Sequence, residues 1–321
     1  MLFFSSKVFE VINYCAFAGV IHKWIRNLSV DRSKTILYSY WLNALAFGIS
    51  LTKNEFPEFT AVSRAHRVDL YQYCSERYLP YRRHILIEMD KVFFISEDGK
   101  KYLGQEFPKF KHKIIVSRLG TRDHGLSEKP YDDFQIISCS SVSEVKRIDL
   151  IILGLEKFAR SNPSKKICWT HIGAGPLMSQ IKDKARILDG RDNVDYKFLG
   201  RLDHVEVFSY FKNNPVDVLI NTSSSEGLPV SIMEAMSFGI PIIATDVGGT
   251  SEPVTDKTGI LIPGDCSPED VSEALNSISK KSRSTDFRIG VRNAWKSKVN
   301  AQENFTNFAE QLNSISEQKT D

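Results

Sequence analysis

The chain has 321 residues, of which 42% are hydrophobic and 25% are charged, and its formal net charge at pH 7 is +3. These values are typical of a globular protein, and the length indicates about two domains. So small a net charge does not indicate a nucleic-acid-binding protein. No stretch approaches the roughly 20 apolar residues of a membrane-spanning helix, which argues against an integral membrane protein.

The cysteines are scattered along the chain, and none of them forms a Cys-x-x-Cys pair. An odd number of unclustered cysteines is typical of reduced thiols rather than of a disulfide framework. We therefore expect a cytoplasmic protein. The five cysteines are Cys15, Cys74, Cys139, Cys168 and Cys266.

Residues 6–27 carry apolar side chains near helical spacing, which predicts a helix. Ala16-Phe17-Ala18 resembles a signal-peptidase site, but Glu10 and Asn13 interrupt the apolar run, so we expect no signal peptide. We expect a domain helix packed on a sheet, and the basic residues near its ends leave a membrane surface as the alternative. The spaced apolar side chains are Val8, Ile12, Cys15, Val20 and Trp24, and the basic ones are Lys7, His22, Lys23 and Arg26.

Four strand-like runs follow, and helical stretches accompany them. This alternation predicts a parallel sheet. The polar stretch from Arg118 to Pro130 then reads as a hinge between domains. The four predicted strands are Thr35–Tyr40, Phe59–Ser63, Lys91–Ser96 and Lys113–Ser117.

The second half contains six such runs, and helical stretches separate most of them, which predicts a doubly wound α/β domain. We place the domains at 1–125 and 126–290. Residues 291–321 are expected to form C-terminal helices. The six predicted strands are Phe134–Ser138, Ile167–Ile172, Asp195–Leu199, Asp217–Asn221, Ile242–Thr245 and Gly259–Ile262.

Loops after the first three of these strands contain candidate site residues. Lys146 and Arg147 place two cations after the first strand. In the second loop, Gly173 lets the backbone approach a ligand, and Pro176 suits the first turn of a helix. The third loop contains Gly200 and Arg201.

The turn Glu226-Gly227-Leu228-Pro229 gives the strongest functional signal. It follows a predicted parallel strand and precedes a predicted helix, the position where open α/β folds bind ligands. Free backbone N–H groups and the helix dipole favour anions and hydroxyl oxygens there. Glu234 lies about two helical turns further on. The two carboxylates can therefore contact different parts of an extended ligand, and sugar hydroxyls are suitable donors to carboxylates.

The sequence from Ser224 to Gly249 resembles the donor-site signature of the retaining glycosyltransferases of family 4. The specific features are Gly227-Leu228-Pro229, Gly239-Ile240-Pro241 and Gly248-Gly249. These enzymes have the GT-B fold, in which two Rossmann-like domains face each other. The resemblance implies this α/β fold, with C-terminal helices that pack back toward the N-terminal domain. The first half reads as four strands without an early Gly-Gly loop, so we expect the N-terminal Rossmann-like domain to be incomplete.

The resemblance also implies roles for particular residues. The stretch from Ser63 to Tyr71 is similar to the family's Arg-Ala-His-Gly-x-Asp motif, so His66 would reach the donor sugar and phosphate, although Arg67 replaces the usual Gly. Lys146 matches the lysine of the family's Gly-Arg-x-x-x-x-Lys-Gly pattern, which holds the diphosphate. Ser141 stands in the arginine place, and we expect the adjacent Arg147 to compensate.

The remaining implied roles concern the donor. By resemblance, Glu226 and the backbone of Gly227, Leu228 and Pro229 position the sugar, and Glu234 holds the ribose hydroxyls. Gly173 lies beside the nucleotide, and Gly200 and Arg201 border its base. We therefore expect Glu226, Lys146 and His66 to be catalytic residues.

The implied activity is retaining transfer of a sugar from a nucleotide-diphosphate-sugar to an acceptor hydroxyl. The stretch Lys146–Ile152 resembles bacterial enzymes that build surface polysaccharides, such as lipopolysaccharide O-antigen or capsule, on a lipid carrier. This implies a lipid-linked or oligosaccharide acceptor and a cytoplasmic location with peripheral contact to the inner membrane. Because the chain has no Asp-x-Asp triplet, we expect no metal ion, and we expect no other cofactor. The alternatives are a non-catalytic nucleotide-sugar-binding remnant, a partner subunit, or a nucleotide-sugar epimerase.

Overall fold

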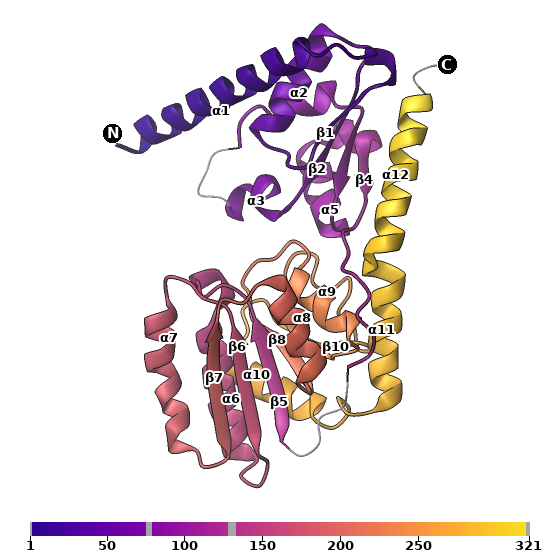
Figure 1. The fold of residues 1–321 in the computed structure, drawn as a ribbon. Helices are drawn as coiled ribbons and strands as arrows, with labels where there is room; N and C mark the ends of the chain where they lie inside the picture. The colour runs from indigo at the N-terminus through magenta and orange to yellow at the C-terminus, as the bar shows by residue number, and fades with distance from the viewer. Residues whose placement is uncertain (1, 75–78, 128–132, 319–321) are drawn as a thin grey trace. The chain divides into compact units, whose positions relative to one another are not determined.

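The computed structural model describes residues 2–74, 79–127 and 133–318 (Figure 1). The chain divides into two compact units, and each is described here by itself. Unit 1 comprises residues 1–119 and 303–321, and unit 2 comprises residues 120–302. The first division follows Leu119 rather than residue 125. The second lies inside the last helix rather than at residue 291, and the predicted hinge residues 128–130 lie outside the described ranges.

Unit 1 contains a parallel sheet of four strands in the order β1-β2-β3-β4. All four predicted strands are confirmed within a few residues. The sheet strands are β1 (Ile36–Ser39), β2 (Thr60–Ala65), β3 (Lys91–Phe94) and β4 (Ile114–Val116). The helices are α1 (Leu2–Arg26), α2 (Ala44–Glu55), α3 (Arg67–Leu70), α4 (Arg82–Glu88) and α5 (Glu97–Glu106), with short 3-10 turns at Arg32–Lys34, Gln72–Cys74 and Pro108–Lys113.

The C-terminal helix α12 (Ala301–Glu317) covers part of this sheet. The ring of Phe308 packs edge-on against Phe93 with centroids 4.9 Å apart, and it lies 5.3 Å from the ring of Tyr38. The guanidinium of the buried Arg64 stacks over the same ring at 4.3 Å. Aromatic and cation–π contacts therefore anchor the end of the chain on the strands of unit 1.

The predicted first helix is confirmed as α1, but its predicted packing is wrong. The helix lies on α2, and Ala18 and Ile25 form the buried side. Gly48 of α2 permits this close approach, because a Cβ there would be 2.7 Å from the Cβ of Ile21. The side chains whose spacing predicted the helix are instead mostly exposed, since α1 is apolar on both sides and its periodicity does not select one. No helix in the described ranges is long and apolar enough to cross a membrane.

Unit 2 contains a parallel sheet of six strands, and all six predicted strands are confirmed. They are β5 (Phe134–Cys139), β6 (Ile167–Ile172), β7 (Val194–Gly200), β8 (Val218–Asn221), β9 (Ile242–Thr245) and β10 (Gly259–Ile262). The helices are α6 (Ile148–Ser161), α7 (Met178–Ala185), α8 (His204–Asn213), α9 (Val230–Ser237), α10 (Pro268–Ile278) and α11 (Thr285–Val299), with 3-10 turns at Glu144–Lys146 and Arg186–Gly190.

The strand order β10-β9-β8-β5-β6-β7 reverses between β5 and β8. From β5 the chain proceeds outward through β6 and β7, and it then returns to the other side of β5 for the remaining strands. In open α/β sheets, ligands bind beyond the carboxyl ends of the strands at such a reversal. The fold of unit 2 therefore places the loops after β5 and β8 at the expected ligand position.

A buried carboxylate ties the amino ends of β5 and β8 together. Asp217 is fully buried, and it accepts hydrogen bonds from the backbone N–H of Gln135 at 2.8 Å and from the guanidinium of Arg283 at 2.8 and 3.0 Å. The bidentate pair satisfies the buried charge. The same arginine donates to the carbonyl of Asp133 at 2.8 Å, so one ion pair joins three segments of unit 2.

We predict that Asp217→Ala lowers the free energy of unfolding by about 3 kcal/mol, because it removes one partner of a buried pair. Asp183→Ala is the matched control, since the ion pair of Asp183 with Arg186 is exposed, and such pairs contribute at most about 1 kcal/mol. Urea denaturation followed by circular dichroism measures both. Equal effects of the two substitutions would contradict the assigned role of Asp217.

A network of buried polar side chains joins β5 and β6. The indole N–H of Trp169 donates to the hydroxyl of Ser138 at 3.0 Å, and this hydroxyl lies 2.8 Å from Nδ1 of His171. All three side chains are buried. Burial lowers the pKa of His171 from its usual 6.5 to about 4, because an imidazolium there would lose its hydration.

The lowered pKa of His171 predicts that the protein is less stable at acidic pH. The unfolded chain takes up a proton on His171 below about pH 6.5, whereas the folded protein resists it until about pH 4, so stability falls as the pH decreases through this window. Lowering the pH from about 8 to about 5 should therefore reduce the free energy of unfolding by about 2 kcal/mol through this histidine. Urea denaturation at both pH values should show that His171→Gln removes this loss, while His112→Gln, at an exposed position, retains it. An unchanged pH dependence in His171→Gln refutes the prediction.

Candidate functional site

The site residues of unit 2 gather at the carboxyl ends of its strands. Lys146 of the loop after β5 meets Glu226 of the loop after β8, with Nζ 2.6 Å from Oε1. The carboxylate is only 7% exposed, and the side-chain amide of Asn221 also approaches the same oxygen at 3.3 Å. Two residues far apart in the sequence therefore form one charged pair at the reversal point of the sheet.

The turn that carries Glu226 is fixed by its neighbours. The side-chain oxygen of Asn221 accepts from the backbone N–H of Ser223 at 2.9 Å. Gly248 has a φ of +56°, and a Cβ there would overlap the carbonyl oxygen of Glu226. The N–H of Gly249 donates to the carbonyl of Gly227 at 2.8 Å. The Gly-Gly pair after β9 thus permits the close backbone approach that holds this turn.

Arg147 binds the same turn from the other side. Its Nε donates to the carbonyl of Thr222 at 2.7 Å, and Nη2 donates to the carbonyl of Ser223 at 3.1 Å. The hydroxyl of Thr222 returns a hydrogen bond to the carbonyl of Lys146 at 3.1 Å. Arg147 itself adopts a left-handed backbone with a φ of 47°. In this structure Arg147 therefore holds the two loops together, and the Lys146 ammonium contacts the Glu226 carboxylate.

The loops after β5 and β6 also approach each other closely. Gly173 has a φ of +143°, and a Cβ there would overlap the carbonyl oxygen of Ser140. Its N–H donates to the carbonyl of Gly200 at 2.8 Å, and the N–H of Val142 donates to the carbonyl of Ala174 at 3.1 Å. Only glycine fits at Gly173, as the sequence predicted for a backbone that must come close to another group.

A cavity of about 530 Å³ lies beside these loops. The predicted residues Gly173, Arg201 and Glu234 line it, and Gly200 precedes Arg201 at the end of β7. Its described lining includes neither Lys146 nor Glu226. The full lining is Cys139, Ser140, Ile172, Gly173, Arg201, Leu202, Asp203, His204, Val207 and Glu234.

His204 and Cys139 are among the polar lining residues that the sequence did not predict. Nδ1 of His204 lies 3.4 Å from Oε1 of Glu234. His204 is the first residue of α8, where Asp203 and Glu206 form a reciprocal capping box that fixes the start of the helix. Cys139 ends β5. The Asp-x-x-Glu capping pattern could have located the start of α8, but no sequence signal places His204 against Glu234.

Burial determines the electrostatics of the cavity. Glu234 is only 5% exposed, and this burial raises the pKa of its carboxyl, while the nearby His204 partly opposes the rise. Burial, assisted by the charge of Glu234, raises the pKa of the Cys139 thiol to about 12, so this thiol stays protonated at neutral pH. Glu234 is thus a buried acceptor whose hydrogen-bonding capacity suits a ligand with hydroxyl donors.

His66 belongs to unit 1 and lies just before α3. The carboxylate of Asp69 accepts from the backbone N–H of His66 at 2.6 Å and from that of Leu42 at 2.5 Å. The rings of Tyr40 and Trp41 pack against the imidazole with centroids 4.6 and 4.2 Å away. Both ring nitrogens of His66 are buried and have no hydrogen-bond partner among the described residues.

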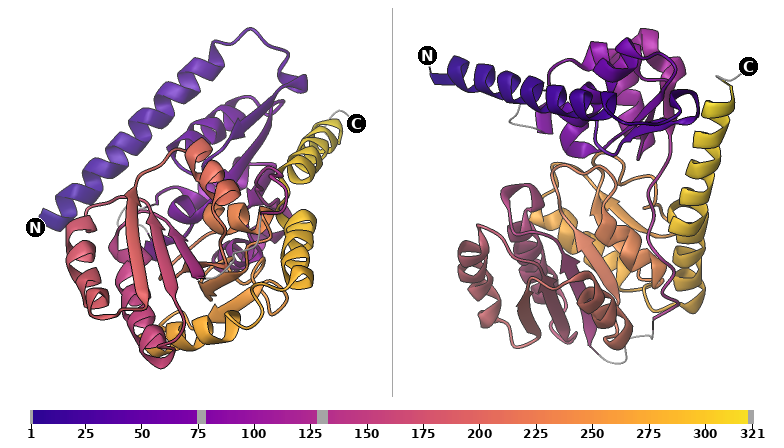
Figure 2. Two further views of the ribbon diagram at one scale, coloured as in Figure 1. Left: turned by 60° about the horizontal axis from the view of Figure 1, so that its bottom comes forward. Right: turned by 45° about the horizontal axis from the view of Figure 1, so that its top comes forward.

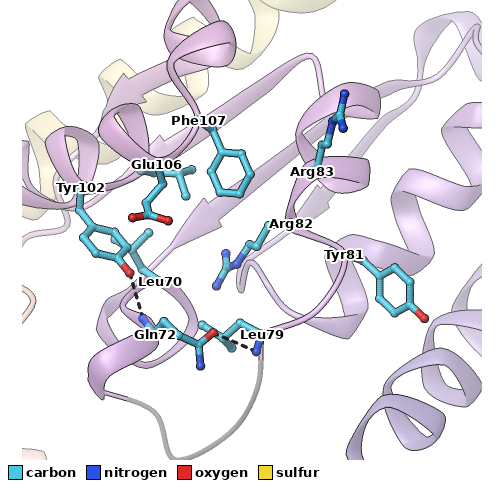
Figure 3. A pocket seen from close by; sticks show the side chains of 10 residues that line it. Leu70, Gln72, Leu79, Tyr81, Arg82, Arg83, Tyr102, Glu106 and Phe107 are labelled. Atoms are coloured by element: carbon cyan, nitrogen blue, oxygen red, sulfur yellow. Dashed lines mark hydrogen bonds between the residues drawn. The ribbon is translucent and has the colours of Figure 1, made fainter. Parts of the chain in front are cut away.

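Unit 1 has a cavity of its own, of about 330 Å³ (Figure 3). The guanidinium of Arg82 points toward the side of the cavity with Leu70, Gln72 and Leu79 in this view, and one of its nitrogens donates to the carbonyl of Asp69. Nη1 of Arg82 is buried without a partner among the described residues. None of the predicted site residues lines this cavity in the described part of unit 1.

The sequence is similar to those of bacterial glycosyltransferases. The putative colanic acid biosynthesis glycosyltransferase WcaL of Escherichia coli (strain K12) is 27% identical over 165 residues, which cover 48% of this chain and 39% of WcaL. The amylovoran biosynthesis glycosyltransferase AmsK of Erwinia amylovora is 26% identical over 174 residues, covering 52% of this chain and 41% of AmsK. The matches therefore span about two fifths of the length of these relatives.

Solved structures share the fold at low sequence identity. The apo form of the lipopolysaccharide outer core galactosyltransferase WaaB has a TM-score of 0.73 and 18% identity, covering 95% of this chain and 81% of WaaB. Anabaena HepE in complex with UDP has a TM-score of 0.70 and 16% identity, covering 93% of this chain and 82% of HepE. The protein therefore has the GT-B fold class with two Rossmann-like domains.

A family model described as "Glycosyl transferases group 1" matches residues 121–297, which include nearly all of unit 2 and both members of the Lys146–Glu226 pair. This match spans more than half of the chain. The chain therefore belongs to the glycosyl transferases of group 1.

Proposed function

We propose that the protein transfers a sugar, with retention at the anomeric carbon, from a nucleotide-diphosphate-sugar to an acceptor hydroxyl. The observation that carries this proposal is the cavity at the sheet reversal of unit 2, where the buried Glu234 faces a space bordered by the Gly173 turn. Its volume of about 530 Å³ suits a small-molecule ligand. Two structurally similar proteins, Anabaena HepE and the pneumococcal O-GlcNAc transferase GtfA, bind UDP in their crystal structures.

In this proposal, different cavity residues contact different parts of the donor. Glu234 accepts hydrogen bonds from the ribose hydroxyls, and these donors compensate the cost of keeping its carboxylate buried. The backbone at Gly173 approaches the diphosphate, and Gly200 and Arg201 border the base. Glu234 contacts His204, with Oε1 3.4 Å from Nδ1, so the ribose must share or replace that contact.

The Lys146–Glu226 pair acts at the sugar end. Glu226 and the backbone of Gly227, Leu228 and Pro229 position the sugar, and Lys146 stabilises the negative charge that grows on the leaving diphosphate. Arg147 holds the loop after β5 against the loop after β8, and its positive charge adds to that of Lys146. His66 is the third residue proposed to act on the donor.

The proposed reaction balances without an added cofactor. The bond from the anomeric carbon to the diphosphate oxygen breaks, a bond to the acceptor oxygen forms on the same face, and the diphosphate takes up the acceptor's hydroxyl proton. No metal ion bridges the diphosphate in this proposal, because the chain contains no Asp-x-Asp triplet and cationic side chains are available instead.

The acceptor is proposed to be a lipid-linked or oligosaccharide intermediate of a cell-surface polysaccharide, made in the cytoplasm beside the inner membrane. Support comes from the relatives, because WcaL and AmsK are described as acting in colanic acid and amylovoran biosynthesis. WaaB is described as a lipopolysaccharide galactosyltransferase.

We predict that one nucleotide diphosphate, or its sugar, raises the thermal stability of the protein. A ligand that binds only the folded state at about 100 times its Kd stabilises it by about 2.7 kcal/mol. Glu234→Ala should weaken this binding at least about tenfold, because charge-assisted hydrogen bonds contribute about 1.5–3 kcal/mol. Glu273→Ala, at an exposed position on α10, is the matched control. Thermal-shift titration that detects no ligand with the folded protein would refute the proposed donor site.

We predict that Lys146→Ala slows release of the nucleotide diphosphate from the bound donor at least about a hundredfold, because it removes charge stabilisation of the transition state. The Kd for the donor should change less than kcat. Lys182→Ala on α7 is the control, since this side chain is exposed. Steady-state kinetics separate kcat from donor binding. A wild-type protein that binds donors but releases no nucleotide with any acceptor would instead be a non-catalytic binding protein or a partner subunit.

A further inference from the structure

The cavity of unit 1 contains a cation that is only partly paired (Figure 3). Nη1 of Arg82 is buried and has no hydrogen-bond partner among the described residues, while Nη2 donates to the backbone carbonyl of Asp69. Burial lowers the pKa of Arg82, and the charge of Asp69 opposes this decrease without cancelling it. An anion that reaches the guanidinium therefore supplies both a missing acceptor and a compensating charge.

The carboxylate of Asp69 is engaged elsewhere. One of its oxygens accepts from the backbone N–H of His66 at 2.6 Å, and the other accepts from that of Leu42 at 2.5 Å. It accepts no hydrogen bond from Nη1 of Arg82. The contacts of Asp69 with its own segment thus leave this side of the guanidinium open to a ligand.

Glu106 is the only carboxylate among the described residues that line the cavity. It is the last residue of α5, its side chain is exposed, and it is not a hydrogen-bond partner of Nη1 of Arg82. Because water screens an exposed charge, Glu106 repels a bound anion only weakly. The partly buried guanidinium therefore dominates the electrostatics of the cavity.

The backbone at Tyr81 directs Arg82 into the cavity. Tyr81 has a left-handed φ of 60°, which a residue other than glycine rarely adopts. Its ring stacks on Phe47 of α2 with centroids 4.3 Å apart, and it lies 6.1 Å from the ring of Tyr14 on α1, the long N-terminal helix in Figures 1 and 2. In Figure 3 the ring of Tyr81 points away from the guanidinium of Arg82. Aromatic packing thus holds the strained backbone that presents the cation.

The rest of the described lining suits a small apolar or aromatic body. The hydroxyl of Tyr102 accepts from the backbone N–H of Gln72 at 3.2 Å, so its own proton can be donated to a ligand. The volume of about 330 Å³ lies at the lower end of the range for small-molecule sites. The apolar lining residues are Leu70, Leu79, Leu103 and Phe107.

We propose that this cavity binds a small molecule that carries a carboxylate or a phosphate group on an apolar or aromatic body. The planar guanidinium of Arg82 binds the anionic group, and the leucine and phenylalanine side chains contact the body. The site is separate from the cavity proposed for the sugar donor, because the two share no described lining residue. Anion binding here does not depend on the proposed transfer, and either can fail while the other succeeds.

The experiment is a titration of the full chain with two aromatic anions, phenyl phosphate and benzoate, followed by saturation-transfer difference NMR. Benzyl alcohol is the neutral control. We expect a Kd on the order of 1 mM for the preferred anion, which is typical of so small a ligand. Benzyl alcohol should bind at least about tenfold more weakly, because it makes no charge-assisted hydrogen bond with Arg82. Tighter binding of phenyl phosphate or of benzoate identifies the natural anionic group as a phosphate or a carboxylate.

Three variants locate the site. Arg82→Gln should weaken binding of the preferred anion at least about tenfold, because it removes the charge-assisted hydrogen bonds. Arg83→Gln is the matched control: its exposed guanidinium points away from that of Arg82 in Figure 3, so the Kd should stay within about twofold. Glu106→Gln should tighten binding about threefold, because it removes a like charge from the lining. Circular dichroism checks that each variant is folded.

The proposal is overturned by wild-type protein that binds neither anion more tightly than benzyl alcohol, since a water molecule would then satisfy Nη1. It is also overturned if folded Arg82→Gln keeps the wild-type Kd, which would place the anion elsewhere on the protein. If Arg82→Gln does not fold, the exposed Glu106→Gln variant decides, and unchanged or weaker binding in that variant contradicts the proposal.

Discussion

The site of unit 2 depends on two places where backbone meets backbone. At Gly173 the loop after β6 touches the carbonyl of Ser140, and at Gly248 the loop after β9 touches the carbonyl of Glu226. Any side chain at either glycine would occupy the position of an oxygen atom. These contacts hold the loop after β6 against the loop after β5, and the loop after β9 against the loop after β8, beside the reversal of the sheet.

The charged side chains of the site lie on the loops that these backbone contacts hold. Both carboxylates of the candidate site are paired, Glu226 with Lys146 and Glu234 with His204. Pairing offsets the cost of burying each carboxylate, and the low local dielectric strengthens each contact. A ligand must therefore share or replace these contacts, and an extended molecule with several hydroxyls can offer hydrogen bonds to both carboxylates. The proposed sugar nucleotide has such hydroxyls at both ends.

The sequence predicted every strand, because buried parallel strands read as short apolar runs between turns and helices. It also located the turn at Glu226 and the glycine at Gly173, since these depend on local chain geometry. The contact between His204 and Glu234 was missed, because it joins two helices whose approach is set by tertiary packing. The packing of α1 was predicted wrongly, because a helix that is apolar all round gives no periodic signal for its buried face.

The family match at residues 121–297 lies within unit 2, so unit 1 must be understood from its own chemistry. His66 is held by its backbone contact to Asp69 and by two aromatic rings. Its Nδ1 lies 3.9 Å from the Asp69 carboxylate, and neither buried imidazole nitrogen has a hydrogen-bond partner among the described residues. An unsatisfied buried polar group costs about 1–3 kcal/mol. A fold that fixes an imidazole so firmly and leaves its hydrogen-bonding groups open has prepared them for a ligand or an ordered water.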